Sequence, residues 1–242
     1  MTTLLIDNSN TRTKFALSTS AGLLPWRGVV ETREITVPAV QRVLVGQRFD
    51  AAVLCSVVPA KAEVLEAALS CPVHRVSSAS VLGMDISYPR PQEIGADRLA
   101  NGVGAFAQYG APCIVIDSGT AVTFDVIEPP GLYAGGVIAP GLNLLTDYFA
   151  EKTALLPKIS LTEPESFIGR STTDAMNIGA IAGFRGLIRE ILTGLIEELP
   201  SPPTVIATGG DAALLFKGIR RINHVNPDLT LDGIRRIGEL NL

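Results

Sequence analysis

Short apolar runs alternate with helical patterns along the whole 242-residue chain. Apolar runs that are rich in Val, Ile and Leu and bounded by turn-forming residues predict β-strands. Such strands are expected at residues 4–6, 14–17, 51–58, 72–76, 113–116, 121–127 and 204–207.

Helical periodicity recurs between these strands, over residues 38–49, 60–70, 97–110 and 172–199. In the third of these segments Leu99, Val103 and Phe106 share one apolar face, and Gly110 supplies a stop signal. Strands that alternate with helices of this length predict a layered α/β fold.

Two segments of the chain resemble one another. LLIDNSNTRTKFAL begins at residue 4 and IVIDSGTAVTFDVI at residue 114, and each has an apolar strand, an aspartate at the strand end, small residues, a threonine and a second strand. Only two copies are present, which favours a duplicated domain over a solenoid. We expect one domain over residues 1–111 and a second over residues 112–242.

The two strand-end aspartates, Asp7 and Asp117, suggest chemistry as well as topology. A carboxylate and the backbone N–H groups of a tight turn at the carboxyl edge of a sheet can bind anions and their metal ions. A third segment runs from a strand into Gly209 and Gly210 and then a helix, so its bare backbone could lie against a base or ribose. The alternative for either aspartate loop is an ordinary hairpin whose small polar residues serve only the turn.

Composition narrows the possible partners. The chain has 20 basic and 24 acidic residues and no long Lys/Arg run, which argues against a nucleic-acid partner.

The three cysteines of the chain are far apart in apolar stretches and are predicted to be buried free thiols. His74 and His224 have no neighbours at ligand spacing, so no transition-metal site is expected. The absence of a signal-peptide pattern and of a long apolar run predicts a cytoplasmic protein with no membrane partner.

The two aspartate loops and the strand–Gly–Gly–helix segment together resemble the sugar kinase, Hsp70 and actin superfamily, in which ATP lies between two RNase H-like halves. Four further segments resemble the ordered motifs of type III pantothenate kinases: YPRPQEIGADR from Tyr88, LYAGGVIAPGL from Leu132, KTALLPKI from Lys152 and IGRSTTDAMNIG from Ile168. The resemblance covers almost the whole chain. It implies phosphorylation of pantothenate by ATP, the first step of coenzyme A biosynthesis, in a homodimer that uses Mg2+ and a monovalent cation such as K+ or NH4+.

The resemblance also assigns residues to roles. Its nucleotide-binding positions are Asp7, Asn8, Ser9, Asn10, Thr11, Arg12, Thr13, Lys14, Gly119, Thr120, Gly209 and Gly210. Its pantothenate-binding positions are Tyr88, Gly95, Ala96, Asp97, Arg98 and, from the partner subunit, Thr172. Asp97 would be the catalytic proton acceptor, Asp7 would hold Mg2+ through water, and Asp117 would ligate the monovalent cation, a task that suits a hard oxygen donor.

The residues themselves leave alternatives open. Asp97 in the first turn of a helix would be a weak base but a good acceptor for a substrate hydroxyl, or simply a helix cap paired with Arg98. Lys14 and Arg98 would attract two anionic substrates, or would be ordinary solvated charges. A bidentate contact of Arg98 with the pantothenate carboxylate is a hypothesis.

Ser9 departs from the family pattern, which usually has glycine at this position. If the position requires a positive φ, serine costs about 1 kcal/mol or more. If glycine is there only for space, the serine side chain would crowd a phosphate, or its hydroxyl would add a hydrogen bond to it.

Glycines on the long predicted helix raise a question about packing. Gly179, Gly183 and Gly186 share one face, where each should destabilise the helix by about 1 kcal/mol unless another element packs closely there. Packing within the chain and packing across a dimer both account for the pattern. The resemblance, which needs Thr172 from a partner, favours the dimer.

Two other functions are compatible with the sequence: a non-catalytic accessory or regulatory relative, and a kinase for another small hydroxy acid. The presence of Asp7, Lys14, Asp97, Asp117 and Thr120 argues against the first, because a protein without catalysis has no physical need for all five.

Overall fold

The computed structural model describes residues 1–210 and 212–242. By their contacts these residues form two compact units. The first comprises Met1–Gly110, Pro129–Ala134 and Asp228–Leu242, and the second Ala111–Glu128 and Gly135–Pro227. The expected cut after residue 111 treats both halves as contiguous, whereas the contacts add two later segments to the first unit.

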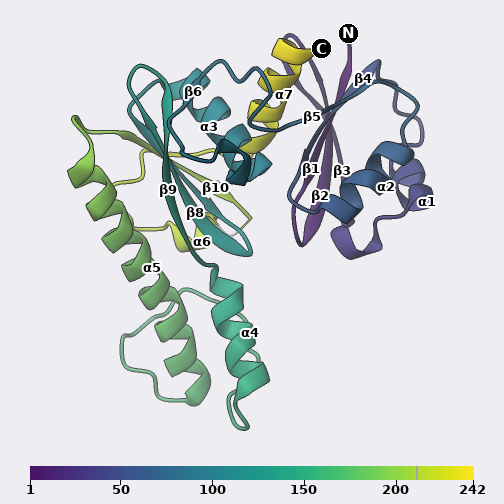
Figure 1. Ribbon diagram of the computed structural model, residues 1–242. Coiled ribbons are helices and arrows are strands. Elements are labelled where there is room, and N and C mark those ends of the chain that lie inside the picture. The colour runs from purple at the N-terminus through teal and green to yellow at the C-terminus, as the bar shows by residue number, and fades with distance from the viewer. Residues whose placement is uncertain (211) are drawn as a thin grey trace. The chain divides into compact units, whose positions relative to one another are not determined.

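A five-stranded sheet forms the centre of the first unit (Figure 1). Its order is β3-β2-β1-β4-β5, with β1 antiparallel to β2 and parallel to β4. The strands are β1 (Thr3–Asn8), β2 (Arg12–Thr19), β3 (Gly22–Glu31), β4 (Ala51–Ser56) and β5 (Val73–Arg75). Strand β3, which the apolar pattern does not predict, is an edge strand.

Helices cover both faces of this sheet, as the alternation along β1 requires. Leu4 and Ile6 belong to a core shared with α1 (Val37–Val43) and α2 (Pro59–Ala67). Leu5 belongs to a second core shared with α3 (Ala96–Tyr109) and α7 (Leu229–Asn241). Two short 3-10 helices, η1 (Thr32–Glu34) and η2 (Pro91–Glu93), complete the unit. The unit is therefore a layered α/β structure, as expected.

Helices α3 and α7 approach closely at two glycines. A Cβ atom on Gly233 would lie 1.8 Å from the carbonyl oxygen of Ala100, and one on Gly104 would lie 2.6 Å from that of Leu229. Nearby, the buried Thr230 hydroxyl donates a hydrogen bond to Asn101 Oδ1 at 2.7 Å. This crossing explains why the C-terminal helix belongs to the first unit.

The second sheet repeats the topology of the first. Its order is β11-β10-β7-β8-β9-β6, with β7 antiparallel to β8 and parallel to β10. The strands are β6 (Asp85–Ile86), β7 (Cys113–Ser118), β8 (Ala121–Glu128), β9 (Leu132–Pro140), β10 (Thr204–Gly209) and β11 (His224–Val225). The run β9-β8-β7-β10-β11 corresponds strand by strand to β3-β2-β1-β4-β5, which confirms the duplication that the two aspartate motifs predict.

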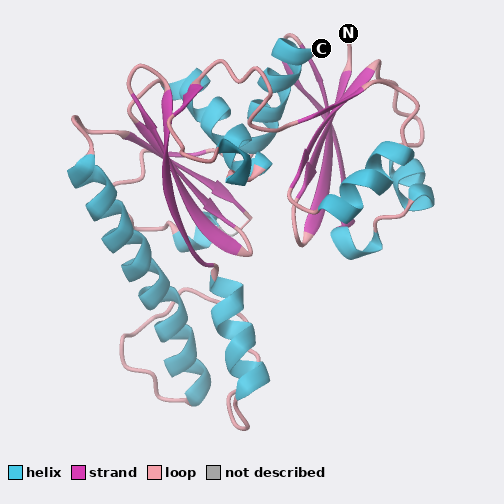
Figure 2. Cartoon of the chain, in the orientation of Figure 1, coloured by secondary structure: helices cyan, strands magenta, loops and turns pink. Residues whose placement is uncertain are grey.

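The described part of the second unit includes the helices α4 (Leu142–Lys152), α5 (Thr172–Glu198) and α6 (Ala212–Leu215) (Figure 2). Helix α5 begins after Ser171, whose hydroxyl accepts a hydrogen bond from the Asp174 N–H at 3.1 Å. Its glycines Gly179, Gly183 and Gly186 are exposed, and a Cβ atom on any of them would meet no described atom within 4 Å. Packing against the described residues therefore does not account for this glycine face.

All three cysteines are free, with Cys55 and Cys113 buried and Cys71 partly exposed. Burial raises the pKa of Cys113 to about 12. Within the described residues, every helix is too short or too polar to serve as a membrane-spanning segment.

Candidate functional site

The first aspartate loop joins β1 to β2. The Ser9 N–H donates to the Arg12 carbonyl at 3.2 Å and closes the turn. Asp7 is only 3% exposed, and both of its carboxylate oxygens have partners. Ser9 Oγ donates to Oδ1 at 3.0 Å, and Lys14 Nζ lies 3.3 Å from Oδ2. The loop thus carries a fixed, partly neutralised carboxylate.

Ser9 fits this loop without backbone strain. No non-glycine residue in the described part of the chain has a positive φ, so the first of the three outcomes expected for Ser9 does not apply. Its hydroxyl instead hydrogen-bonds the neighbouring carboxylate of Asp7.

The predicted nucleotide-binding residues of this loop divide into two groups. Asn10, Thr11 and Arg12 are exposed. Asn8 and Thr13 are buried, and their side chains are hydrogen-bonded to each other, from Asn8 Nδ2 to Thr13 Oγ1 at 2.8 Å. The side chains of this second group therefore support the loop from beneath.

The predicted catalytic residue lies at the start of α3. Asp97 Oδ1 accepts a hydrogen bond from the Arg98 N–H at 2.8 Å. A Cβ atom on Gly95 would lie 2.6 Å from Asp97 Oδ1 and 3.7 Å from Val57 Cγ1. The glycine therefore leaves room for the carboxylate and lets the helix begin close to the end of β4.

Asp7 and Asp97 converge on one buried thiol of the first unit. Cys55 on β4 is the register partner of Asp7 on β1. Burial raises the pKa of Cys55, and the negative charges of Asp7 and then Asp97 raise it further. Since electrostatic effects of this kind decline with distance, both carboxylates lie in the same part of the unit.

Arg98 is not an ordinary solvated charge. Its side chain is buried, and its guanidinium carbon lies 6.0 Å from the centroid of the buried Tyr133 ring. Tyr88 packs against the core cluster that contains Ala96 and Tyr133. The structure thus brings four predicted pantothenate-binding residues, Tyr88, Ala96, Asp97 and Arg98, to the region around the start of α3.

In the second unit, three backbone segments meet at the end of β7, where Asp117 lies. A Cβ atom on Gly209, whose φ is 102°, would lie 2.2 Å from the carbonyl oxygen of Ser118. Gly141 donates its N–H to the Thr120 carbonyl at 3.1 Å, and a Cβ atom there would lie 2.3 Å from the Gly119 carbonyl oxygen. The structure therefore brings together three predicted nucleotide-binding residues, Gly119, Thr120 and Gly209. It also adds Gly141 to this group, which the sequence pattern does not indicate.

Asp117 has a different strand partner from Asp7. The register partner of Asp7 on the next strand is Lys14, whereas that of Asp117 is Thr123. Thr123 Oγ1 is buried and has no hydrogen-bond partner among the described residues. Directly opposite residues on antiparallel strands lie on the same face of a sheet. A hydroxyl oxygen and a carboxylate therefore line one face here, a donor set that fits a hard cation.

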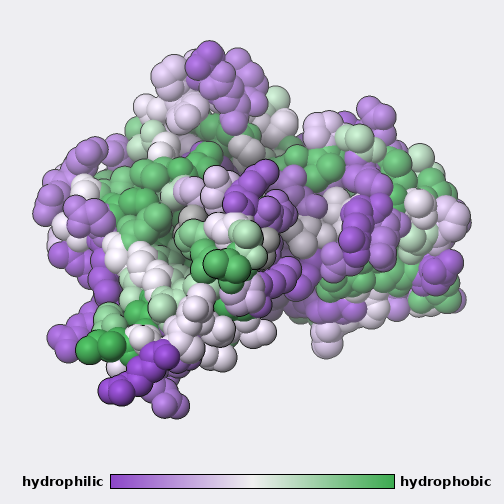
Figure 3. All heavy atoms as spheres, turned by 90° about the horizontal axis from the view of Figure 1, so that it is seen from below, coloured by the Kyte–Doolittle hydropathy of each residue, from purple (hydrophilic) through white to green (hydrophobic). Residues whose placement is uncertain are grey.

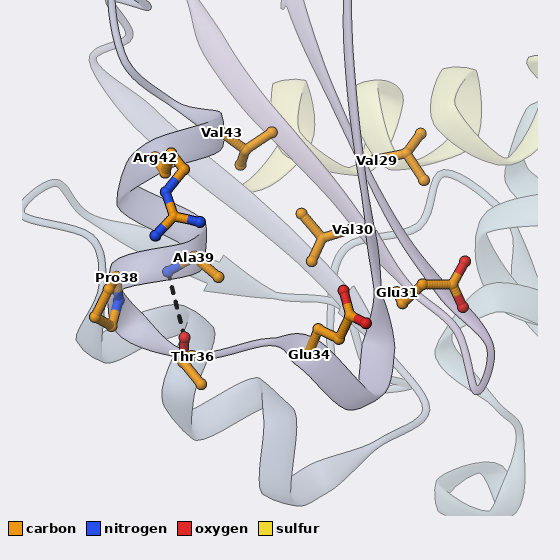
Figure 4. Close-up of a pocket in the computed structure, with 9 residues that line it drawn as sticks. All are labelled: Val29, Val30, Glu31, Glu34, Thr36, Pro38, Ala39, Arg42 and Val43. Carbon is orange, nitrogen blue, oxygen red and sulfur yellow. Dashed lines mark hydrogen bonds between the residues drawn. The ribbon is translucent and has the colours of Figure 1, made fainter.

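Two grooves on the described part of the chain contain none of the predicted site residues. One, of about 640 Å³, lies between β3 and α1 and includes Glu31, Glu34 and Arg42 (Figure 4). The other, of about 320 Å³, lies near the start of α5 and includes Arg170 and Asp174, with the exposed Thr172 between them in sequence. The predicted site residues lie instead in loops and at the start of α3.

A buried arginine fastens three segments of the second unit together. Arg185 on α5 pairs bidentately with Glu163, at 2.8 and 2.7 Å, and donates to the carbonyls of Leu214 and Leu215 at the end of α6. The hydrogen bonds between the two side chains lower the pKa of Glu163 and raise the pKa of Arg185. We call this arrangement of Arg185, Glu163, Leu214 and Leu215 the clasp. No local sequence pattern indicates it.

Solved structures of other proteins resemble this fold over almost the whole chain. A Campylobacter jejuni protein assigned to the Baf family of transcriptional activators matches with a TM-score of 0.66 and 19% identity, over 98% of this chain and 97% of its own. A Sinorhizobium meliloti protein assigned as a 2-dehydro-3-deoxygalactonokinase matches with a TM-score of 0.64 and 10% identity, over 98% and 95%. At these identities the likeness establishes the fold alone.

Sequence comparison is more specific. The family model described as type III pantothenate kinase matches residues 3–194. A curated type III pantothenate kinase from Akkermansia muciniphila is 57% identical over 242 residues, which is 100% of both chains. The chain belongs to the type III pantothenate kinase family.

Proposed function

We propose that the protein transfers the γ-phosphoryl group of ATP to the hydroxyl of pantothenate and so produces 4′-phosphopantothenate. The observation that carries this proposal is the match to type III pantothenate kinases over the whole chain. The first unit supports it, because the charges of both Asp7 and Asp97 raise the pKa of Cys55, the register partner of Asp7. One carboxylate belongs to a phosphate-binding turn and the other to a helix start that also carries the buried Arg98. A donor loop and an acceptor-aligning group are the two parts that phosphoryl transfer requires close together.

The first loop would bind phosphates of ATP through its exposed backbone at Asn10 and Thr11 and through Lys14. Asp7 would hold Mg2+ through water. The described residues contain no group of three metal-ligating side chains, which fits Mg2+ because this ion commonly takes one or two carboxylates and completes its shell with phosphates and waters. When bound, Mg2+ neutralises charge on the phosphates.

The glycine-rich turns of the second unit would bind further parts of the nucleotide. Gly119 and Thr120 would contact phosphates, and Gly209 and Gly210 would lie against the nucleoside. Asp117, with Thr123 Oγ1, would ligate the monovalent cation.

Asp97 would accept a hydrogen bond from the pantothenate hydroxyl and then its proton. A general base of this kind contributes about 10² to 10⁴ in rate. Tyr88, Gly95, Ala96 and Arg98 would complete the acceptor pocket, together with Thr172 of a second subunit.

We also propose that the protein acts as a homodimer. The exposed glycine face of α5 supports this, as do large apolar side chains exposed before α5, with Leu155 at 90%, Phe167 at 83% and Ile168 at 75%. Figure 3 shows apolar side chains, in green, at the molecular surface. A partner that packs on α5 would cover some of this surface and bring its Thr172 to the pocket.

A coupled assay of ADP release tests the function. Pantothenate should stimulate ADP release by the wild type in K+ more than in Na+. Asp97→Asn should lower kcat by about 10² to 10⁴, because an amide cannot take the proton. Asp50→Asn, which changes an aspartate that only accepts the Thr2 N–H, serves as the matched control.

Two outcomes would contradict the proposal. If no hydroxy acid stimulates ADP release, a non-catalytic accessory role is favoured. If only an acid other than pantothenate does so, the protein is a kinase for that acid.

A further inference from the structure

Thr32 holds the first phosphate loop from both sides of its tip. It follows β3, begins η1 and is only 3% exposed. Its hydroxyl donates to the Ser9 carbonyl at 2.7 Å, and its N–H donates to the Thr11 carbonyl at 2.9 Å. These two carbonyls flank Asn10, the exposed residue at the tip of the loop.

The Thr32 hydroxyl is the end of a buried chain of hydrogen bonds whose direction is fixed. A hydroxyl has a single proton. Since Thr32 donates its proton to Ser9, it must accept from Thr13 Oγ1 at 3.1 Å. Thr13 in turn accepts from Asn8 Nδ2, and Asn8 Oδ1 accepts from Ser56 Oγ at 2.6 Å.

This arrangement determines where a backbone donor points. In a trans peptide the C=O and the following N–H point in opposite directions. The Ser9 carbonyl points toward Thr32, so the Asn10 N–H points away from it, out of the unit's interior. Outward N–H groups of a turn are the donors that bind phosphate oxygens.

We propose that Thr32 is a positioning residue for nucleotide binding, which aims the Asn10 N–H at a phosphate of ATP through its hydrogen bond to the Ser9 carbonyl. The proposal rests on the function proposed above. Thr32 itself does not touch the nucleotide.

Three variants separate positioning from a merely structural role. Thr32→Val removes the donor and leaves the Ser9 carbonyl and the Thr13 hydroxyl without their partner. Thr32→Ser keeps the hydroxyl. Thr36→Ala is the control at a nearby threonine, because the Thr36 hydroxyl accepts a local hydrogen bond from the Ala39 N–H, at 3.3 Å, at the start of α1 (Figure 4).

The measurements are calorimetric titration of the full chain with Mg–ATP in the absence of pantothenate, and steady-state kinetics. Thr32→Val should weaken ATP binding and raise the KM for ATP, each about tenfold, which is the effect of losing one hydrogen bond between the Asn10 N–H and a phosphate. The KM for pantothenate should stay unchanged. Thr32→Ser should stay near the wild type, and Thr36→Ala should lower Tm without changing ATP affinity.

The outcomes distinguish the two proposals. Unchanged ATP affinity in Thr32→Val, or an equal loss in Thr36→Ala, would overturn the role of Thr32 and leave the kinase function intact. If the wild type binds ATP but pantothenate does not stimulate ADP release, the kinase function is overturned. The titrations with Mg–ATP would still test the role of Thr32. A wild type that binds no ATP would overturn both.

A further substitution keeps the proposal testable if Thr32→Val does not fold. Thr32→Cys keeps a small side chain with a weak donor. It should bind ATP more weakly than Thr32→Ser. Equal affinities of these two variants would overturn the proposal.

Discussion

At the scale of single residues, the most informative feature is the buried carboxylate of Asp7. A buried charge is costly unless it is paired and hydrogen-bonded. Lys14 and Ser9 meet this requirement from opposite sides, one at each carboxylate oxygen. Ser9 is therefore more than a tolerated replacement for glycine: it fixes the orientation of the carboxylate that we assign to Mg2+.

This role of Ser9 can be tested with Ser9→Ala, which removes the hydroxyl and leaves the backbone preference similar. The free energy of unfolding should fall by about 1 kcal/mol, because one hydrogen bond to a charged group is lost from a partly exposed loop. The Mg2+ concentration for half-maximal kinase activity should rise severalfold. Urea denaturation and a Mg2+ titration of ADP release measure the two effects. Ser9→Thr, which keeps the hydroxyl, is the control, and an identical Mg2+ dependence in Ser9→Ala would count against the role.

At the scale of elements, the clasp joins α5 to the segment around Glu163 and to the end of α6. Helix α6 follows the Gly209–Gly210 turn that we assign to the nucleoside. The bidentate geometry makes the pair specific for arginine and carboxylate. The clasp should therefore stabilise the second unit and, through α6, the nucleoside turn.

The clasp predicts a defined pH dependence of stability. The pKa of Glu163 is lowered in the folded state. Glu163 therefore stabilises the fold fully above its ordinary pKa of 4.5 and loses this contribution as the pH falls through the lower folded pKa. Glu163→Gln should be less stable than the wild type near neutral pH, and the difference should disappear in acid. Urea denaturation of both proteins from pH 7 to pH 3 measures this, and Glu165→Gln, at an exposed neighbour, is the control. A difference that is constant with pH would contradict the assignment.

Local pattern was sufficient for some elements and not for others. Apolar runs located the central strands, and the repeated strand-end aspartates indicated the duplication and both loops. Strand β3 was missed because an edge strand that contains Pro25 and alternates in exposure lacks a strong apolar run. Helix α7 is not among the predicted helices. It contains Gly233 and Gly238, which lower helix propensity, but both lie where another part of the unit approaches closely.

The contacts that hold the site residues in place could not be predicted from the sequence either. Thr32 lies 23 positions from Ser9, and Glu163 lies 22 positions from Arg185. Neither separation matches the three- or four-residue period of a helix or the two-residue period of a strand. Contacts of this kind depend on how the elements pack, so only the fold reveals them.

At the scale of the whole molecule, the open glycine face of α5 predicts dimerisation. Gly183→Arg should yield monomers, because a long charged side chain would separate two closely packed helices. It should also lower kinase activity, since a monomer lacks the partner's Thr172. Light scattering at micromolar concentration measures the mass.

Gly183→Ala provides the matched comparison. A Cβ atom at this position meets no described atom within 4 Å, so alanine should raise helix stability by about 1 kcal/mol in an isolated chain. If the wild type is already monomeric in solution, the dimer proposal fails.

The first unit is assembled from three stretches of sequence, the last of which is Asp228–Leu242. The segment Asp228–Leu242 must therefore leave the ribosome before the layer containing α7 can close over β1 and β4. The first unit is thus completed only after the second unit has been synthesised, and until then Leu5 and Val53 lack the cover of Ile234 and Ile237. Nascent chains of this enzyme should depend on shielding of that apolar sheet face during translation.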